Sequence, residues 1–245
     1  LPGMDGLAGS FGAKVGIFDP NDVTADTAGF SATDKHAPRV EAQITYGSSI
    51  GGLGIDLWVD GSYQNTDRNE AEAAARTQQD AAGIETTRRG ANGNDSRDTD
   101  VDSAGVGFGT KLSYEGFQLV ASGFWGNAMG IRGQHTFGAN TSVGALDDVG
   151  TERKTYGGYL QGTFDFSQGT SVGYSYGGNC LKRTGNDIQT RGVMNCQTMH
   201  SGMIWHNVTD NFRLVAEGGY TEKTWYLADS DQEDSFGGVG AFFFW

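Results

Sequence analysis

The sequence lacks long hydrophobic runs and has little positive charge. No stretch approaches the roughly 20 apolar residues that a membrane-spanning helix needs, which excludes a helical membrane protein. Lys and Arg number 17 against 30 Asp and Glu, which gives a net charge of -13 over 245 residues. Because phosphate binding needs a basic surface, this balance argues against nucleic acid as a partner. It is consistent with acidic surface loops or with an interior that tolerates cations.

A recognisable export signal is also absent, and cysteine is scarce. Residues Leu1–Met4 resemble neither the charged start of a signal peptide nor the residues left after its cleavage, so for an exported protein we expect an upstream segment. The two cysteines, Cys180 and Cys196, lie close together in a loop-like stretch without metal-ligand spacing around them. They predict one disulfide formed in an oxidising compartment, with two free thiols as the alternative.

The sequence does contain a recurring alternation of apolar and polar residues, the period-two pattern of half-buried strands. In its clearest instance, Leu57 and Val59 alternate with Asp56 and Asp60. The pattern predicts about ten strands, over Phe11–Phe18, Arg39–Tyr46, Leu53–Tyr63, Ala104–Tyr114, Phe117–Trp125, Tyr156–Phe166, Thr170–Tyr176, Met199–Asn207, Phe212–Tyr220 and Phe236–Trp245.

The segments between these strands alternate between long and short. Long polar segments fall at 19–38, 64–103, 126–155, 177–198 and 221–235, and short turns at 47–52, 115–116, 167–169 and 208–211. A transmembrane antiparallel β-barrel has this arrangement, whereas a soluble sandwich has no reason to sort its connections by length. Lumen-facing and loop residues account for the low mean hydropathy of -0.43. We therefore expect a single all-β barrel domain over residues 1–245.

The chain ends on an aromatic stretch, Phe236–Trp245. Consecutive aromatic residues are not expected at a chain terminus that frays into water. They are expected in a barrel strand that ends in the aromatic girdle at a membrane surface. The spacing of Gly240, Phe243 and Trp245 resembles the C-terminal signal by which bacterial outer-membrane barrels are recognised for insertion. A buried edge strand of a soluble sandwich is the alternative for this stretch alone.

Four further stretches carry a family resemblance. Residues 114–123 (YEGFQLVASG), 156–164 (YGGYLQGTF), 171–177 (SVGYSYG) and 208–217 (VTDNFRLVAE) resemble the C-terminal half of Gram-negative general-diffusion porins. The resemblance implies a trimer of 16-stranded barrels in the bacterial outer membrane that passes small hydrophilic solutes passively. The chain departs from that pattern because it holds about ten strands. Either N-terminal strands and the constriction loop are absent, or the chain is a complete ten-stranded barrel.

In a porin, charged side chains that point into the lumen tune ion selectivity. The residues predicted to line the pore are Lys14, Arg39, Glu41, Asp56, Asp60, Lys111, Asp165, Arg213 and Glu217. From the acidity of the chain we expect a weak preference for cations. His200 and His206 share one face of their strand and are interpreted as lumen-facing residues that solvate the pore.

Other functions have weaker support. A small closed barrel could serve as an anchor or adhesin through its loops. A barrel protease needs Asp–His pairs at its rim, and although Asp147–Asp148 occurs, none of the histidines (His36, His135, His200, His206) has an adjacent Asp. We therefore predict that the protein is not an enzyme.

No cofactor is expected. The carboxylates Asp95, Asp98, Asp100 and Asp102 resemble a calcium loop but lack its Gly and closing Glu, so a solvated acidic loop is favoured over Ca²⁺. The expected partners are outer-membrane lipid, lipopolysaccharide and further copies of the chain.

Overall fold

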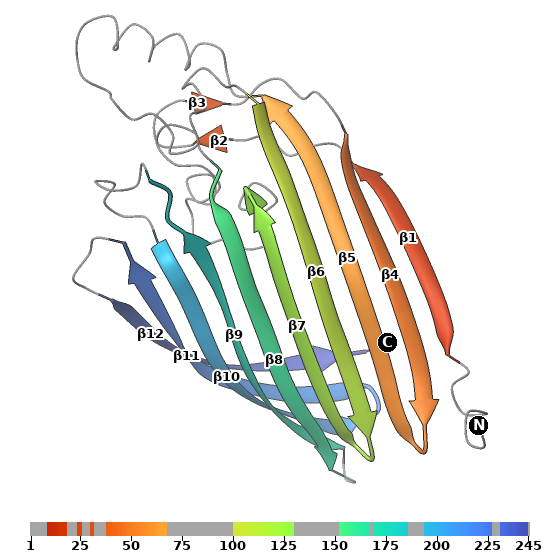
Figure 1. The fold of residues 1–245 in the computed structure, drawn as a ribbon. Helices are drawn as coiled ribbons and strands as arrows, with labels where there is room; N and C mark the ends of the chain where they lie inside the picture. Colours follow the sequence, from red (N-terminus) through yellow and green to blue (C-terminus); the bar gives the residue numbers. More distant parts are fainter. Residues whose placement is uncertain are drawn as a thin grey trace, which may run out of the picture.

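The computed structural model describes residues 9–18, 24–25, 30–31, 38–67, 100–129, 152–166, 169–185, 194–226 and 231–244. The described chain is built almost entirely of strands, and ten of them form one antiparallel sheet (Figure 1). These are β1 (Ser10–Phe18), β4 (Arg39–Ile50), β5 (Leu53–Asp67), β6 (Asp100–Tyr114), β7 (Phe117–Asn127), β8 (Lys154–Phe166), β9 (Thr170–Lys182), β10 (Met194–Thr209), β11 (Phe212–Trp225) and β12 (Gln232–Phe243). The short strands β2 (Thr24–Ala25) and β3 (Phe30–Ser31) pair separately.

The sheet is a meander in which each strand pairs with the next one along the chain, from β1 at one edge to β12 at the other. Tight turns join the strands at one end of the sheet, and the strand ends that border the long connections lie at the opposite end (Figure 1). The turn between β6 and β7 has φ of 45° at Glu115 and 83° at Gly116. Two successive positive φ values match the twist of a two-residue hairpin. The predicted all-β fold and the sorting of its connections are confirmed.

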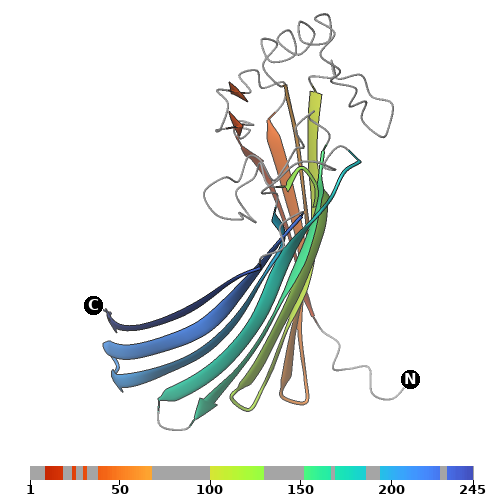
Figure 2. The ribbon, with the colours of Figure 1, turned by 90° about the vertical axis from the view of Figure 1, so that its left-hand side faces the viewer.

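Cross-strand register divides the side chains into two faces, which we call outward and inward. The outward face carries Leu57 and Val59, and the inward face carries Asp56 and Asp60. Leu57 is 44% and Val59 53% exposed on the outward face. The polar side chains buried within the strands all lie on the inward face: Gln64, Ser103, Thr155, Ser171, Ser175, Ser201 and Thr221. The sheet is curved (Figure 2), and side chains on the concave side of a curved sheet converge and bury one another. Since the buried polar side chains lie on the inward face, the inward face is the concave one.

Aromatic residues flank the apolar part of the outward face at two heights. Tyr63, Trp125 and Tyr156 lie toward the long connections, and Phe117 and Phe166 lie toward the turns. From Tyr156 to Phe166, β8 rises about 34 Å, which at a tilt of about 40° is about 26 Å in height. This matches the apolar band of about 25 Å, with an aromatic girdle at each interface, that transmembrane barrels present to lipid.

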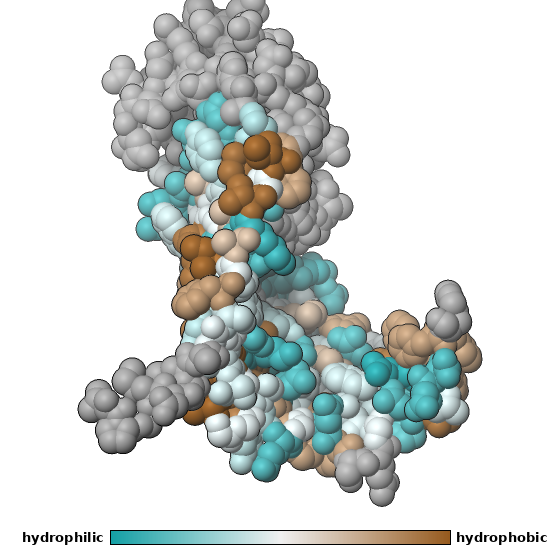
Figure 3. Space-filling view, turned by 90° about the vertical axis from the view of Figure 1, so that its right-hand side faces the viewer, coloured by the Kyte–Doolittle hydropathy of each residue, from teal (hydrophilic) through white to brown (hydrophobic). Residues whose placement is uncertain are grey.

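The two edges of the sheet are exposed. On β1, Phe11, Val15 and Ile17 are 80, 74 and 72% exposed. Figure 3 views the molecule from the side on which β1 lies, and apolar side chains gather there beside polar ones. On β12, Val239 is 89% exposed. The ten strands therefore form an open, curved sheet rather than a closed barrel. No helix in the described ranges is long and apolar enough to span a membrane.

Candidate channel-lining face

The inward face brings together all the charged residues that the sequence predicts to line a pore. Register places Lys14 beside Gln43 and Gln43 beside Asp60, and Asp56 lies directly opposite Lys111. The face continues across the sheet to the other predicted residues, which are Arg39, Glu41, Asp165, Arg213 and Glu217. Their shared orientation follows from the two-residue period of a strand, because a residue one position away would point outward.

On the β1 side, the inward face is hollowed. A hollow of about 420 Å³ is lined by charged and polar side chains that include Lys14, Glu41, Gln43, Asp60 and Ser62. Near it, Arg39 Nε lies 3.0 Å from Glu41 Oε1. The Arg39 guanidinium also lies 5.1 Å from the centre of the Phe18 ring. This part of the wall therefore presents both acidic and basic groups to the concave side.

On β8 to β11, the inward carboxylates are held by neighbouring hydroxyls. Ser171 Oγ donates a hydrogen bond to Asp165, and Ser201 Oγ donates one to Glu217 at 2.5 Å. A hydroxyl that donates to a carboxylate fixes the direction of the carboxylate. These contacts hold both carboxylates in defined positions on the inward face.

Glycines opposite large inward side chains shape the wall. A Cβ added to Gly109 would lie 2.1 Å from the Trp58 ring, and one added to Gly107 would lie 2.6 Å from Asp60 Oδ1. Trp58 and Asp60 therefore lean over the neighbouring strand. Sequence reasoning missed these glycines, although the direct register between them and the large residues is the signal that identifies them.

Sequence reasoning also missed Lys223, which was expected in a long loop. The structure extends β11 to Trp225, and Lys223 Nζ pairs with Asp234 Oδ2 of β12 at 3.1 Å on the inward face. The alternation Lys223, Thr221, Gly219 continues that of Glu217 and Arg213 and could have revealed the longer strand.

His200 and His206 lie on the outward face, so the prediction that they face the lumen is wrong. His200 shares a row with Tyr176, and His206 with Leu214. Tyr174 Oη hydrogen-bonds His200 Nδ1 at 2.5 Å, and Thr170 Oγ1 hydrogen-bonds His206 Nδ1 at 2.8 Å. The inward side of β10 instead carries Met199, Met203 and Trp205, the residues that apolarity alone would assign to lipid.

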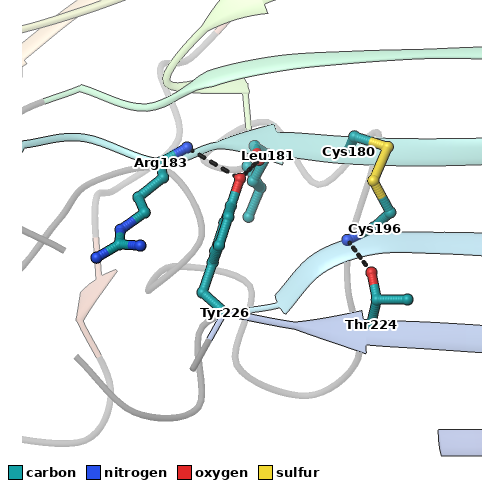
Figure 4. The surroundings of a disulfide bond; sticks show 6 residues. All are labelled: Cys180, Leu181, Arg183, Cys196, Thr224 and Tyr226. Carbon is teal, nitrogen blue, oxygen red and sulfur yellow. Dashed lines mark hydrogen bonds between the residues drawn. A yellow bond between two sulfur atoms is a disulfide. The ribbon is translucent and has the colours of Figure 1, made fainter. Parts of the chain in front are cut away.

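The predicted disulfide is present. Cys180 and Cys196 are bonded, but they are direct cross-strand partners in β9 and β10 rather than the ends of a loop, because both strands are longer than predicted. Beside the bond, the Cys196 amide donates to Thr224 Oγ1 at 3.2 Å, and Tyr226 Oη donates to the Leu181 carbonyl at 2.6 Å (Figure 4). The disulfide and the bond to Thr224 together tie β9, β10 and β11 near the long connections.

The weak calcium candidates are only partly described. Asp95 and Asp98 lie outside the described residues, and for Asp100 only the backbone is described. Asp102 lies at the loop end of β6, and its Oδ1 accepts hydrogen bonds from Asn65 Nδ2 at 2.9 Å and Tyr63 Oη at 2.7 Å, which lower the pKa of this carboxyl. Among the described residues, no cluster of three potential metal ligands occurs.

The C-terminal motif is described up to residue 244. Gly240 and Phe243 lie in β12, and the Phe243 ring stacks on Phe212 of β11 with centroids 4.7 Å apart. Trp245 lies outside the described residues, as do Asp147, Asp148, His36 and His135.

Comparison with known proteins supports the fold. No protein-family model matches the sequence, and no curated protein matches it. Among solved structures, the chain is similar to the outer membrane channel DcaP of Acinetobacter baumannii, with a TM-score of 0.69 and 13% sequence identity. The match covers 96% of this chain and 59% of that channel. The ten-stranded sheet therefore matches part of the fold of that outer membrane channel, and the chain spans little more than half the length of that channel.

Proposed function

We propose that this chain forms part of the wall of an outer-membrane porin, a non-enzymatic, water-filled channel for passive diffusion of small hydrophilic solutes and ions. The observation that carries the proposal is the division of one sheet into two faces. Between its two aromatic rows the outward face is mainly apolar, with His200, which Tyr174 hydrogen-bonds, as an exception. The inward face holds acidic and basic groups on a concave wall. A lipid-facing exterior around a polar lumen is the arrangement that a transmembrane channel requires.

The proposed channel contains more strands than the ten in this sheet. About eight strands enclose a bore that side chains fill, whereas 16 leave an aqueous channel. The exposed edges β1 and β12 present unpaired backbone groups, which are costly in a membrane unless further strands pair with them. These edges favour a 16-stranded barrel, assembled as a trimer as the sequence resemblance implies, over a small closed barrel that acts as an anchor or adhesin.

The test is single-channel conductance of the native, detergent-extracted protein in a planar bilayer. We expect large ohmic openings that close in three equal steps. Absence of conductance from protein shown to be folded would contradict the channel. It would favour the alternative, a closed barrel that acts as an anchor or adhesin through its loops. Openings that close in a single step would contradict the trimer alone.

A further inference from the structure

Aromatic side chains also lie on the inward face, where a water-filled lumen favours polar ones. Register across β6 and β7 places Trp58 of β5 and Tyr159 of β8 in one row of the sheet. Phe124 of β7 lies one row nearer the long connections. We call these three residues the inward aromatic group. Along β8, Tyr159 lies between Tyr156 and Phe166, so the group lies between the heights of the two outward aromatic rows.

Glycines on the neighbouring strands allow two of these rings to lie close to the wall. A Cβ added to Gly109 would lie 2.1, 2.3 and 2.8 Å from three carbons of the six-membered ring of Trp58, so this ring covers Gly109. A Cβ added to Gly157 would lie 2.5 Å from Cε1 of Phe124. Both aromatic side chains are half-buried. Each ring therefore lies across the neighbouring strand, with its free side toward the concave space.

Part of this apolar surface is exposed on the inward face. Tyr159 is 38% exposed, and Met199, which lies in the same row on β10, is 39% exposed. Because apolar surface in contact with water is unfavourable, a solute that covers it gains free energy of binding. Small-molecule sites are typically lined by aromatic and apolar side chains together with a few polar groups that fix the orientation of the ligand.

Hydrogen-bonding side chains border the inward aromatic group on both sides. Gln161 lies one row nearer the turns, and Asn179 lies one row nearer the long connections. Amide oxygens accept hydrogen bonds from hydroxyls, and amide nitrogens donate to them. Charges of both signs also lie beside the group, because Asp56 is directly opposite Lys111. An uncharged solute with many hydroxyls fits these surroundings better than an ion of either sign.

Apolar faces between hydrogen-bonding edges match the chemistry of a saccharide. A sugar ring carries C–H groups on its faces and hydroxyls at its edge, and the electron-rich face of an aromatic ring attracts partially positive hydrogens. We propose that Trp58, Phe124 and Tyr159 form a binding surface for an uncharged saccharide on the inward face, with Gln161 and Asn179 as partners for its hydroxyls. This inference rests on the channel of the proposed function, and it names a class of solute and the residues that bind it.

The test uses the full chain, folded in a neutral detergent and titrated with cellotriose by isothermal titration calorimetry. The glucose units of this probe carry their hydroxyls at the ring edge, so both ring faces present C–H groups. Each aromatic ring should contribute about fivefold to affinity, so Trp58→Leu with Tyr159→Leu should weaken binding about 25-fold. The matched control Trp125→Leu removes an outward ring and should bind as the unmodified chain does. Trp58→Phe with Tyr159→Phe should preserve binding, because both rings are kept.

A second measurement uses the unmodified chain and does not depend on how the variants fold. Oxidation by hydroxyl radicals, followed by mass spectrometry, should fall at Trp58 and Tyr159 when cellotriose is added and should not change at Trp125. Sorbitol is the reference, because it scavenges radicals but has no ring face. Equal oxidation of Trp58 with cellotriose and with sorbitol would overturn the proposal.

Three calorimetric results would also overturn it. The first is equal cellotriose affinity of the Leu double variant and the unmodified chain. The second is equal affinity of the unmodified chain for cellotriose and sorbitol, which would assign binding to hydroxyls alone. The third is tighter binding of benzyl alcohol than of cellotriose, which would assign the rings to apolar solutes. Conductance is measured separately: a silent protein that binds cellotriose contradicts the channel, whereas a conducting protein that does not bind it contradicts the saccharide surface alone.

Discussion

Leu160 and Gln161 are neighbours on β8 but have different surroundings. Leu160 lies on the outward face, 48% exposed, in a row with Ala121 and Tyr176. Gln161 lies on the inward face and accepts a hydrogen bond from the Tyr159 hydroxyl. The same contrast recurs along the strands because successive side chains of a strand point to opposite faces of the sheet. Position in the alternation therefore predicts what a substitution costs better than residue type does.

The largest expected effect comes from placing a charge on the wrong face. Leu160→Arg should lower the free energy of unfolding in lipid vesicles by about 2–4 kcal/mol, because the residue lies between the two aromatic rows at the centre of the apolar band. Gln161→Arg, one residue away, should cost much less because it extends into the lumen. Denaturant unfolding followed by tryptophan fluorescence measures both. Equal costs for the two variants would contradict the assignment of the faces.

Loss of the disulfide should have the second-largest effect on stability. Cys180→Ser with Cys196→Ser removes a cross-link over a sequence separation of 16. The chain-entropy model gives a loss of up to about 3 kcal/mol. Adding reductant should lower the unfolding midpoint of the unmodified chain to that of the double variant and leave the variant itself unchanged. If reductant leaves the unfolding midpoint of the unmodified chain unchanged, the disulfide does not contribute to the stability of the sheet at this end.

A smaller effect should separate crowded from open glycines. Gly109→Ala brings a methyl group against the Trp58 ring on the inward face and should cost about 1–3 kcal/mol, the range for overpacked sites. Gly61→Ala is the control on the outward face, where the nearest atom to the new Cβ is 3.6 Å away. Unfolding midpoints compare the two. A costly Gly61→Ala with a tolerated Gly109→Ala would reverse the contrast.

The smallest effect concerns selectivity. Neutralising two inward carboxylates, with Asp56→Asn and Asp60→Asn, should lower the cation-to-anion permeability ratio, because fixed charges in a lumen attract counterions. Asp102→Asn removes an outward carboxylate at the loop end and should leave the ratio unchanged. Reversal potential in a salt gradient measures both, and an unchanged potential in the inward double variant would rule out these residues as selectivity determinants.

The sequence predicted the structure best in the stretches where apolar and polar residues alternate clearly. Over Leu53–Tyr63 the alternation identified both the strand and its faces, because apolar and polar side chains alternate there with strong contrast. Beyond the apolar band both sides of a strand are polar, so the alternation loses contrast. This is why β9 and β10 extend past their predicted ends and carry the disulfide within strands. His200 was assigned to the wrong face because a hydrogen bond with Tyr174, a diagonal neighbour on β9, makes an outward histidine acceptable, and only the folded structure reveals this contact.

The pairing of each strand with its successor has a kinetic consequence. Because every partner in the sheet is a sequence neighbour, the sheet can grow one hairpin at a time, without a search for distant segments. Even the long segment between β5 and β6 closes onto a direct pair, Asp67 with Asp100. The entropy of closing a flexible loop rises by only about 0.6 kcal/mol for each doubling of its length. Segments on the loop side can therefore lengthen or shorten among related chains with little penalty to assembly of the strands.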